Sequence, residues 1–417
     1  MKNNKLYFLL LLFLLVLSAC APQTGQTSTE SQVLEEEIAA TDPGFETPEE
    51  EGSATVTPQD ESSNNSNPPP GAVREFTTDF SKHAVPFDEI LSGGPSKDGI
   101  PPVDNPSFVS VEEADEWLDP REPVIRVLID QTVKAYPIQI LMWHEIVNDI
   151  VGGSPIVVSY CPLCNTAIVF DRTVDGQVLD FGTSGRLRYS NLIMYDRQTE
   201  SWWQQGTGEA IVGELLGAQL EFVPAAMISW DAYKEAYPEG VVLSRETGHN
   251  RPYGSNPYTG YDAVGNIPFL YQGPETPDDL PPVARILGLD VEGEAVAYPY
   301  PLLREFGVVN DQVGEKSVVI FWVPGTASAL DTQFIADGKD VGAAIAFNRV
   351  LNGQELSFRF DGEAFIDNET GSTWDFLGNA LSGPLQVERL EEVIANNYLW
   401  FAWAAFKPET RIFEPGL

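Results

Sequence analysis

Cysteine, histidine and basic residues are scarce in this chain of 417 residues. It has three cysteines and three histidines, and its 24 Lys and Arg stand against 62 Asp and Glu, for a formal net charge of −38. A charge of this sign argues against nucleic acid and anionic lipid surfaces as partners, because both are themselves negatively charged. It is also typical of a well-solvated surface outside the cytoplasm.

The sequence also lacks the short motifs of several enzyme classes. It contains no Gly-x-Ser-x-Gly nucleophile elbow, no His-Glu-x-x-His zinc motif, no c-type haem motif and no dinucleotide-binding fingerprint. Whatever chemistry the chain performs must therefore come from a less familiar arrangement of side chains.

A charge-free apolar run is present at the start of the chain. It extends from Leu6 to Leu17 behind a short basic start, and it ends in Leu-Ser-Ala-Cys at Cys20. These features predict a secretory signal peptide over residues 1–19, which is too short to span a bilayer comfortably. The ending resembles the bacterial lipobox, which implies cleavage before Cys20 and lipidation of its sulfur.

We therefore expect the protein to be extracytoplasmic and lipid-anchored through Cys20 to the bacterial cell membrane or the outer membrane. Residues 20–75 are rich in Ser, Thr, Glu and Pro and hold no Lys or Arg before residue 74. Such a composition buries too little apolar surface to fold, so this stretch is predicted to be a disordered acidic tether.

The folded part contains an internal duplication. Residues 135–167 align without a gap with residues 297–329, at an offset of 162, and twelve of the 33 positions are identical. The shared residues include Ala-Tyr-Pro at the start of both segments and Val-Asn-Asp in the middle of both. The predicted domains are accordingly a first repeat unit at 76–250 and, at 251–417, a connecting loop with a second, degenerate unit.

Each unit is predicted to mix strands and helices, with strands in the majority. Residues 123–137 have the pattern of a strand hairpin, residues 138–147 that of a buried helix, and residues 155–160 that of a buried strand. A second hairpin is expected around Asp175-Gly176. The fold class is therefore predicted to be α+β, β-rich, with a tandem duplication of one mixed unit.

Several stretches resemble those that mark the domain-of-unknown-function 3179 family. They are AYPIQILMWHEIVND, YCPLCNTAIVFDR, MYDRQTESWW and NRPYGSNPY. The resemblance covers most of residues 120–410, and the Cys-Pro-Leu-Cys segment is its most specific part. It implies membership of that family and no particular biochemical role.

Two of the three cysteines form the Cys-Pro-Leu-Cys pair, Cys161 and Cys164. Three interpretations are open. The pair can be a structural disulfide, although so small a ring gains little entropy. It can perform thiol–disulfide exchange, although the residues after Cys164 have the pattern of a strand and so provide no helix dipole. It can also bind a transition metal, copper or zinc, because two thiolates at this spacing can share one ion.

The duplication favours a specialised role for the first unit. The second repeat replaces Cys161, Cys164, His144 and Glu145 with other residues, so these side chains are not needed to build the unit. His144 is the third candidate metal or redox residue. Glu145, Met194, His249 and Arg186 are possible additions: the first three could be ligands, and Arg186 could hold an anion.

The sequence therefore predicts an anchored lipoprotein that binds copper or zinc, or that performs thiol redox chemistry, at Cys161 and Cys164. Whether it is an enzyme stays open. The alternative is an extracytoplasmic binding protein for a peptide or glycan, with a purely structural cysteine pair. In either case the small molecule or protein that serves as its partner is not identified by the sequence.

Overall fold

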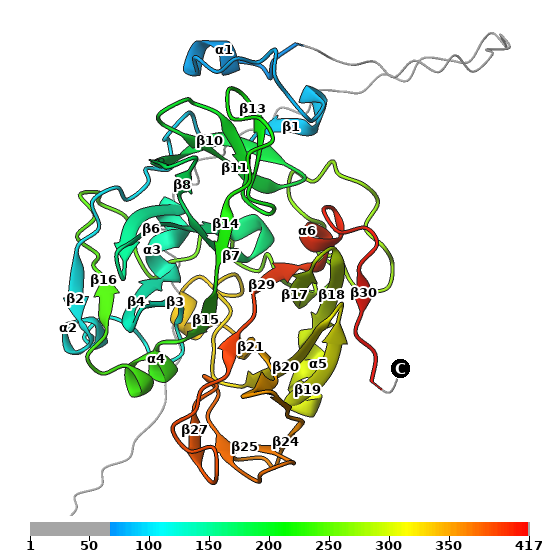
Figure 1. Cartoon of the computed structure of the whole chain (residues 1–417). Coiled ribbons are helices and arrows are strands. Elements are labelled where there is room, and N and C mark those ends of the chain that lie inside the picture. Colours follow the sequence, from blue (N-terminus) through cyan, green and yellow to red (C-terminus); the bar gives the residue numbers. More distant parts are fainter. Residues whose placement is uncertain (1–66, 416–417) are drawn as a thin grey trace, which may run out of the picture. The chain divides into compact units, whose positions relative to one another are not determined.

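The computed structural model describes residues 67–415, and Figure 1 shows its course. The predicted signal peptide, the lipidation site Cys20 and most of the predicted tether lie outside these residues. None of the helices within residues 67–415 is long and apolar enough to cross a membrane.

An N-terminal segment precedes the first repeat and packs onto it. Its helix α1 lies inside the range predicted as tether, so the folded part begins earlier than residue 76. Strand β1 joins the sheet of β10, and β2 pairs with β16. The elements of this segment are α1 (Ala72–Glu75), η1 (Phe87–Glu89), β1 (Ile90–Ser92), β2 (Phe108–Ser110) and α2 (Val111–Asp115).

The first repeat contributes four strands to each of three sheets, in the orders β10-β11-β12-β13, β14-β7-β6-β5 and β15-β3-β4-β16, and its strands β8 and β9 form a fourth, two-stranded sheet. Its elements, drawn from cyan to green in Figure 1, are β3 (Pro123–Ile129), β4 (Thr132–Pro137), α3 (Ile138–His144), β5 (Ile146–Val151), β6 (Ser154–Cys161), η2 (Pro162–Cys164), β7 (Thr166–Asp171), β8 (Thr173–Val174), β9 (Gln177–Val178), β10 (Phe181–Arg188), β11 (Asn191–Asp196), β12 (Trp202–Gln204), β13 (Glu209–Val212), β14 (Glu221–Val223), β15 (Ala225–Ser229), α4 (Trp230–Ala236) and β16 (Val241–Leu243).

The second repeat forms the equivalent sheets, with orders β24-β25-β26-β27, β28-β21-β20-β19 and β29-β17-β18-β30, and a two-stranded sheet of β22 and β23. Its elements, drawn from yellow to red, are β17 (Arg285–Val291), β18 (Glu294–Pro299), α5 (Tyr300–Phe306), β19 (Val308–Val313), β20 (Lys316–Val323), η3 (Ile335–Asp337), β21 (Ala343–Asn348), β22 (Val350–Leu351), β23 (Gln354–Glu355), β24 (Phe358–Phe360), β25 (Phe365–Asp367), β26 (Thr373–Trp374), β27 (Ala380–Ser382), β28 (Glu391–Glu392), β29 (Ala395–Leu399), α6 (Trp400–Ala404) and β30 (Arg411–Ile412).

The β-rich α+β fold and its duplication are thus confirmed, strand for strand. The predicted hairpin at 123–137 is β3 and β4, in antiparallel register. The predicted helix is shorter than expected, because Ile146 and Val147 already belong to β5. The hairpin at Asp175-Gly176 joins only the two-residue strands β8 and β9, because β7 pairs with β6 and β14 instead.

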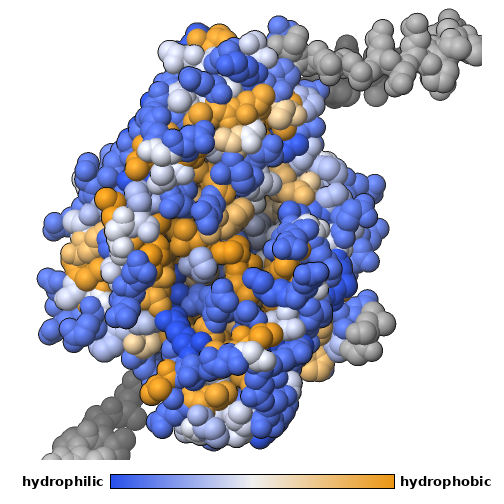
Figure 2. Space-filling model, viewed as in Figure 1, coloured by the Kyte–Doolittle hydropathy of each residue, from blue (hydrophilic) through white to orange (hydrophobic). Residues whose placement is uncertain are grey.

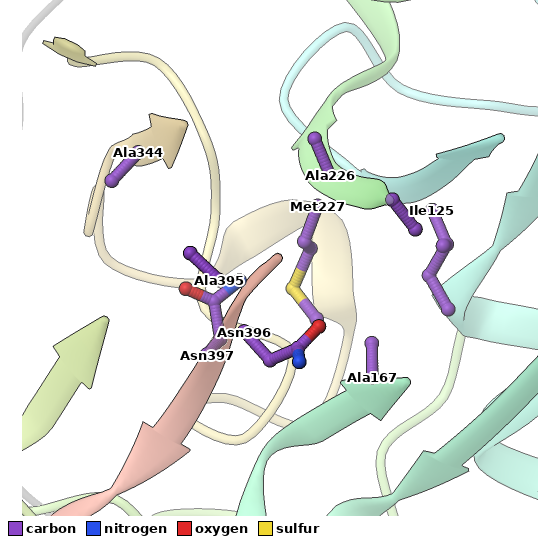
Figure 3. A pocket seen from close by; sticks show the side chains of 9 residues that line it. Ile125, Ala167, Ala226, Met227, Ala344, Ala395, Asn396 and Asn397 are labelled. Carbon is purple, nitrogen blue, oxygen red and sulfur yellow. The ribbon is translucent and has the colours of Figure 1, made fainter. Parts of the chain in front are cut away.

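The two repeats pack against each other through two equivalent contacts. Strand β7 of the first repeat contacts β29 of the second, and β21 of the second contacts β15 of the first. A buried ion pair crosses the seam, with Arg126 Nη2 2.7 Å from Glu392 Oε1. A cavity of about 10 Å³ remains beside Met227 and Asn396 (Figure 3). It has room for one water molecule at most and is therefore a packing defect rather than a ligand site.

Candidate thiol site

Strand β6 ends at Cys161, and the short 3₁₀ turn η2 carries the chain to Cys164. Pro162 begins this turn, where its fixed φ fits and its missing N–H is not needed. Asn165 ends the turn in the left-handed conformation at φ 50°, which Asn tolerates better than most residues. Strand β7 then begins, as the sequence predicts. The turn brings both sulfurs to the carbonyl of one residue, Ser190.

Both cysteines are thiols in this structure, and both are buried. Cys161 is 2% exposed and Cys164 is fully buried. Both sulfurs approach the carbonyl oxygen of Ser190, at 3.8 Å from Cys161 and 3.4 Å from Cys164. The pair therefore lies at the start of β11, against the neighbouring sheet of the same repeat.

The pKa values of the two thiols shift in opposite directions. Burial alone raises the pKa of Cys161, but hydrogen bonds from the Cys164 thiol and from the backbone N–H groups of Leu192, Cys164 and Leu163 outweigh it, so its pKa is lowered. Burial raises the pKa of Cys164 well above its ordinary value, and donating its proton to Cys161 raises it further. The lower pKa of the pair therefore belongs to Cys161 and the higher one to Cys164.

A buried network of amides supports Cys164. Asn191 Nδ2 donates to the Cys164 sulfur at 3.4 Å and to Gln205 Oε1 at 2.8 Å. Gln204 Nε2 donates to Asn191 Oδ1, and Gln205 Nε2 donates to the hydroxyl of Ser159 at 3.1 Å. Buried polar groups need such partners, so the network fixes the Asn191 side chain against the sulfur.

Glu145 is the carboxyl group of the site. Its side chain is 8% exposed, and burial raises its pKa well above the usual range, with the charge of Cys161 adding to the effect. The same carboxyl contributes to the raised pKa of Cys164 and of Tyr258. Glu145 therefore belongs to the immediate electrostatic surroundings of both sulfurs.

The connector, defined as residues 244–284 between the repeats, covers the pair. Tyr258 and Tyr261 pack against the core cluster that holds both cysteines. The Ser190 hydroxyl donates to the Phe269 carbonyl at 2.5 Å, which joins the connector to the residue whose own carbonyl faces the sulfurs. The connector is fixed further on by Asp262, whose carboxylate pairs with Arg285 at 2.7 Å.

The histidines form a separate group. His144 is fully buried, with Nδ1 2.6 Å from the Pro101 carbonyl and Nε2 2.6 Å from the Tyr253 hydroxyl. Burial lowers its pKa, which favours the neutral ring. His249 is exposed, with its ring centroid 5.6 Å from that of His144. Both nitrogens of His144 are thus engaged away from the sulfurs.

Of the other two predicted residues, Met194 lies with the cysteines and Arg186 lies away from them. Met194 is fully buried on β11 and belongs to the core cluster of the two cysteines. Arg186 is bound elsewhere, because its guanidinium lies 3.3 Å from Glu75 and 3.3 Å from the Pro70 carbonyl. It therefore fastens the N-terminal segment to β10 and has no role at the thiol pair.

Metal ligands are not assembled around the pair. Across residues 67–415, no group of three or more His, Cys, Asp and Glu side chains is placed to hold an ion. Two thiolates alone can still bind a soft ion, and copper or zinc binding stays a prediction.

A cavity of about 620 Å³ opens near the pair, between β14 and α6, where the surface is hollowed in Figure 2. Leu220, Phe222, Tyr398 and Trp403 contribute its apolar and aromatic walls. Gly206, also in the wall, donates its N–H to Asn191, which in turn contacts Cys164. Asn191 therefore connects the wall of the cavity to Cys164.

Sequence reasoning missed Ser190, Asn191, Gln205 and Tyr258, all of which lie far from the cysteines along the chain. The sequence placed Tyr258 only in the connecting loop at the start of residues 251–417, with no role at the pair. Asn191 and Gln205 gave no signal, since only the packing of two sheets brings them to Cys164.

The model of one protein family, described as a protein of unknown function (DUF3179), matches residues 97–410. The chain belongs to this family. The match covers both repeats and the connector, and it includes the thiol pair. No curated protein and no solved structure shows significant similarity to the chain.

Proposed function

We propose that this member of the DUF3179 family is an extracytoplasmic lipoprotein, anchored through Cys20, that performs thiol–disulfide exchange at Cys161 and Cys164. The lipobox-like sequence supports the anchor. The observation that carries the chemistry is the placement of two buried thiols against one carbonyl, that of Ser190, with Asn191 donating to the sulfur of Cys164. Beside this geometry, the pKa of Cys161 is lowered and that of Cys164 is raised.

Such an arrangement suits the two steps of thiol–disulfide exchange. A stabilised thiolate at Cys161 attacks one sulfur of a disulfide R–S–S–R′, forms a mixed disulfide and releases R′S⁻. Cys164 then loses its proton, attacks the Cys161 sulfur and releases RS⁻. The pair is thereby oxidised by two electrons and the substrate disulfide is reduced to two thiols; the reverse sequence oxidises a dithiol substrate.

The substrate we propose is a protein thiol or disulfide rather than a small one. The connector exposes Val264, Ile267 and Phe269 within six residues, at 79%, 86% and 56% exposure. Clusters of exposed apolar residues are typical of protein contact surfaces. Phe269 is also joined to Ser190 beside the sulfurs, so a partner that binds there can shift the cover of the buried pair.

Alkylation by iodoacetamide as a function of pH tests the asymmetry. We expect Cys161 to react with a midpoint below that of an ordinary thiol, once the protein is reduced, and Cys164 to react only after unfolding. Peptide mass spectrometry assigns the modified residue. Equal reactivity of both thiols, or a midpoint at Cys161 that matches that of a free cysteine, would contradict the proposal.

A second candidate function is the binding of a peptide or glycan, with the thiol pair in a structural role. The cavity beside Tyr398 and Trp403 favours it, because aromatic walls are typical of such sites. Trp403→Ala separates the two functions. It should weaken ligand binding if the cavity is the functional site, and leave the alkylation profile unchanged if the thiol pair is.

A further inference from the structure

Position 145 has a backbone conformation that glycine adopts easily and other residues adopt at a cost. Glu145 lies directly after α3 with φ 58° and ψ −30°. Its N–H donates to the Leu141 carbonyl at 2.7 Å, and its carbonyl accepts from Tyr160 at 2.8 Å. A side chain with a Cβ is strained in this region of the φ/ψ map.

The second repeat has glycine at the same place. Gly307 lies directly after α5 with φ 69° and ψ −33°. Its N–H donates to the Leu303 carbonyl at 2.8 Å, and its carbonyl accepts from Trp322 at 2.9 Å. The two positions therefore share their backbone conformation and both backbone hydrogen bonds. The unit can be built with glycine here, and the first repeat nevertheless has a glutamate.

The Glu145 carboxyl is also unusual in its surroundings. The residue is only 8% exposed, and its carboxylate oxygens are not among the fully buried side-chain atoms that lack a hydrogen-bond partner. Position 145 lies beside the end of β6, because its carbonyl accepts from the N–H of Tyr160, the residue before Cys161. The titratable groups whose charges act together with the carboxyl on their pKa values are Cys161, Cys164 and Tyr258. Burial makes the charged form of a carboxyl costly, so a glutamate at a position where glycine builds the same turn points to a chemical role.

Glutamate and the two cysteines are absent together from the second repeat. There Gly307, Val323 and Thr326 take their places. We infer that Glu145 is the proton-transfer residue of the thiol pair, which gives a proton to the first leaving thiolate and accepts the proton of Cys164. This inference rests on the proposed thiol–disulfide exchange and adds to it the residue that manages the protons.

The proton balance of the two steps is complete with this residue. In the first step, Cys161 S⁻ attacks R–S–S–R′, and the protonated carboxyl of Glu145 gives its proton to R′S⁻, which leaves as R′SH. In the second step, the Glu145 carboxylate takes the proton of Cys164 as that sulfur attacks Cys161. The Cys161–Cys164 disulfide forms and RS⁻ leaves. The carboxyl ends protonated, as it began, which agrees with its raised pKa.

The test compares Glu145→Gln with wild type in the full chain held in detergent, with 2-hydroxyethyl disulfide as the substrate. Acid quenching and mass spectrometry follow the mixed disulfide and the closed disulfide over pH 5–9. We expect Glu145→Gln to slow closure at least tenfold, to accumulate the mixed disulfide, and to lose one inflection of the pH–rate profile. Glu145→Asp should recover part of the rate.

Glu122→Gln is the matched control. Burial raises the pKa of Glu122 to about 7, but this carboxyl accepts a hydrogen bond from Gln139 and does not face the thiols. It should keep the wild-type closure rate and pH profile. An unchanged profile in Glu145→Gln would overturn the inference, and so would an equal loss in both variants.

The outcomes also separate this inference from the function on which it rests. If wild type forms no reversible disulfide, the proposed exchange fails. If wild type forms it and Glu145→Gln closes it equally fast, only the role of Glu145 fails. Glu145→Gly, which carries the residue of the second repeat, provides a second variant whose backbone is compatible with the position, and it should show the same slow closure.

Discussion

The two repeats have the same framework and different interiors. In the first, Trp203 Nε1 donates to buried Asp196 at 2.9 Å, and in the second Trp374 Nε1 donates to buried Asp367 at 3.0 Å. The Tyr136–Asp149 hydrogen bond recurs as Tyr298–Asp311, and Asn148 and Asn310 bridge equivalent strands. Identical residues in the two repeats are therefore those that build the sheets.

The differing residues gather in one place. Ser159, which anchors the amide network behind Cys164, corresponds to Phe321 in the second repeat. Phe321 stacks on Phe365 with ring centroids 4.0 Å apart and contacts Phe347 and Phe358. The space that holds thiols and amides in one repeat is thus filled with aromatic rings in the other. The duplication separates the requirements of the fold from those of the site.

The largest effect is expected from converting the site of the first repeat to that of the second. Cys161→Val with Cys164→Thr should abolish all reversible disulfide formation, because no thiol then remains in residues 67–415. The fold should persist, since the second repeat tolerates both residues on the same backbone. Circular dichroism and thiol counting check this; a variant that fails to fold would show that the framework depends on the pair.

Removing a shared framework residue should affect both repeats alike. Asp196→Ala and Asp367→Ala each leave a buried Trp N–H and a Thr without their acceptor. Each should lower the free energy of unfolding by about 3 kcal/mol, because a buried donor left without its acceptor costs about 1–3 kcal/mol. Urea unfolding measures this. A large loss in one repeat with almost none in the other would show that the two frameworks are not equivalent.

The connector that covers the site should depend on one buried carboxylate. Burial alone raises the pKa of Asp262, but Arg285, Ser328 and Lys339 outweigh it and lower the pKa to about 2. A lowered folded-state pKa stabilises the fold above the unfolded pKa of 3.8, and this contribution is lost as pH falls through about 2. Asp262→Asn should therefore cost about 2 kcal/mol at pH 7 and nothing near pH 1.5. An equal cost at both pH values would exclude the ionic mechanism.

The smallest effect is expected at the strained position. Glu145→Gly should raise the free energy of unfolding by about 1 kcal/mol, because it relieves the positive φ. The gain should grow as pH rises above the unfolded pKa of the carboxyl, since burial raises its folded pKa and so disfavours the charged form. A loss of stability would instead assign Glu145 a structural role.

The reverse change is its control. Gly307→Glu should destabilise, because a Cβ at Gly307 would lie 2.6 Å from the Phe360 ring. Equal and opposite shifts in the two variants are not expected, since the second repeat has no space at this position. A neutral Gly307→Glu would show that the two positions differ in more than their side chains.

The fold was largely predictable because the sequence patterns that indicate it are either local or present twice in the chain. The period-two pattern of β3 and β4 and the gapless alignment of the repeats require no knowledge of packing. The closeness of Cys161 and Cys164 follows from their spacing. The strand predicted after Cys164 is present as β7, and only the three-residue 3₁₀ turn η2 precedes it, so no α-helix dipole acts on the pair.

The partners of the site were not predictable for a physical reason. Asn191 reaches Cys164 only because β11 packs against the end of β6, and no sequence pattern encodes that distance. His144 was a plausible ligand by residue type, but α3 directs it to Pro101 and Tyr253. Arg186 was a possible anion-binding residue by its type. In the structure its guanidinium pairs with Glu75, which lies within the range predicted as tether.

The most direct test of the central claim is a redox titration of the full chain in ratios of reduced to oxidised dithiothreitol, with free thiols counted by alkylation and mass spectrometry. We predict a single reversible two-electron transition in which Cys161 and Cys164 join and separate together. Titration with copper and zinc on the reduced protein runs beside it. Thiols that stay unjoined at every ratio in a folded protein, or that bind one metal ion and resist oxidation, would contradict the account.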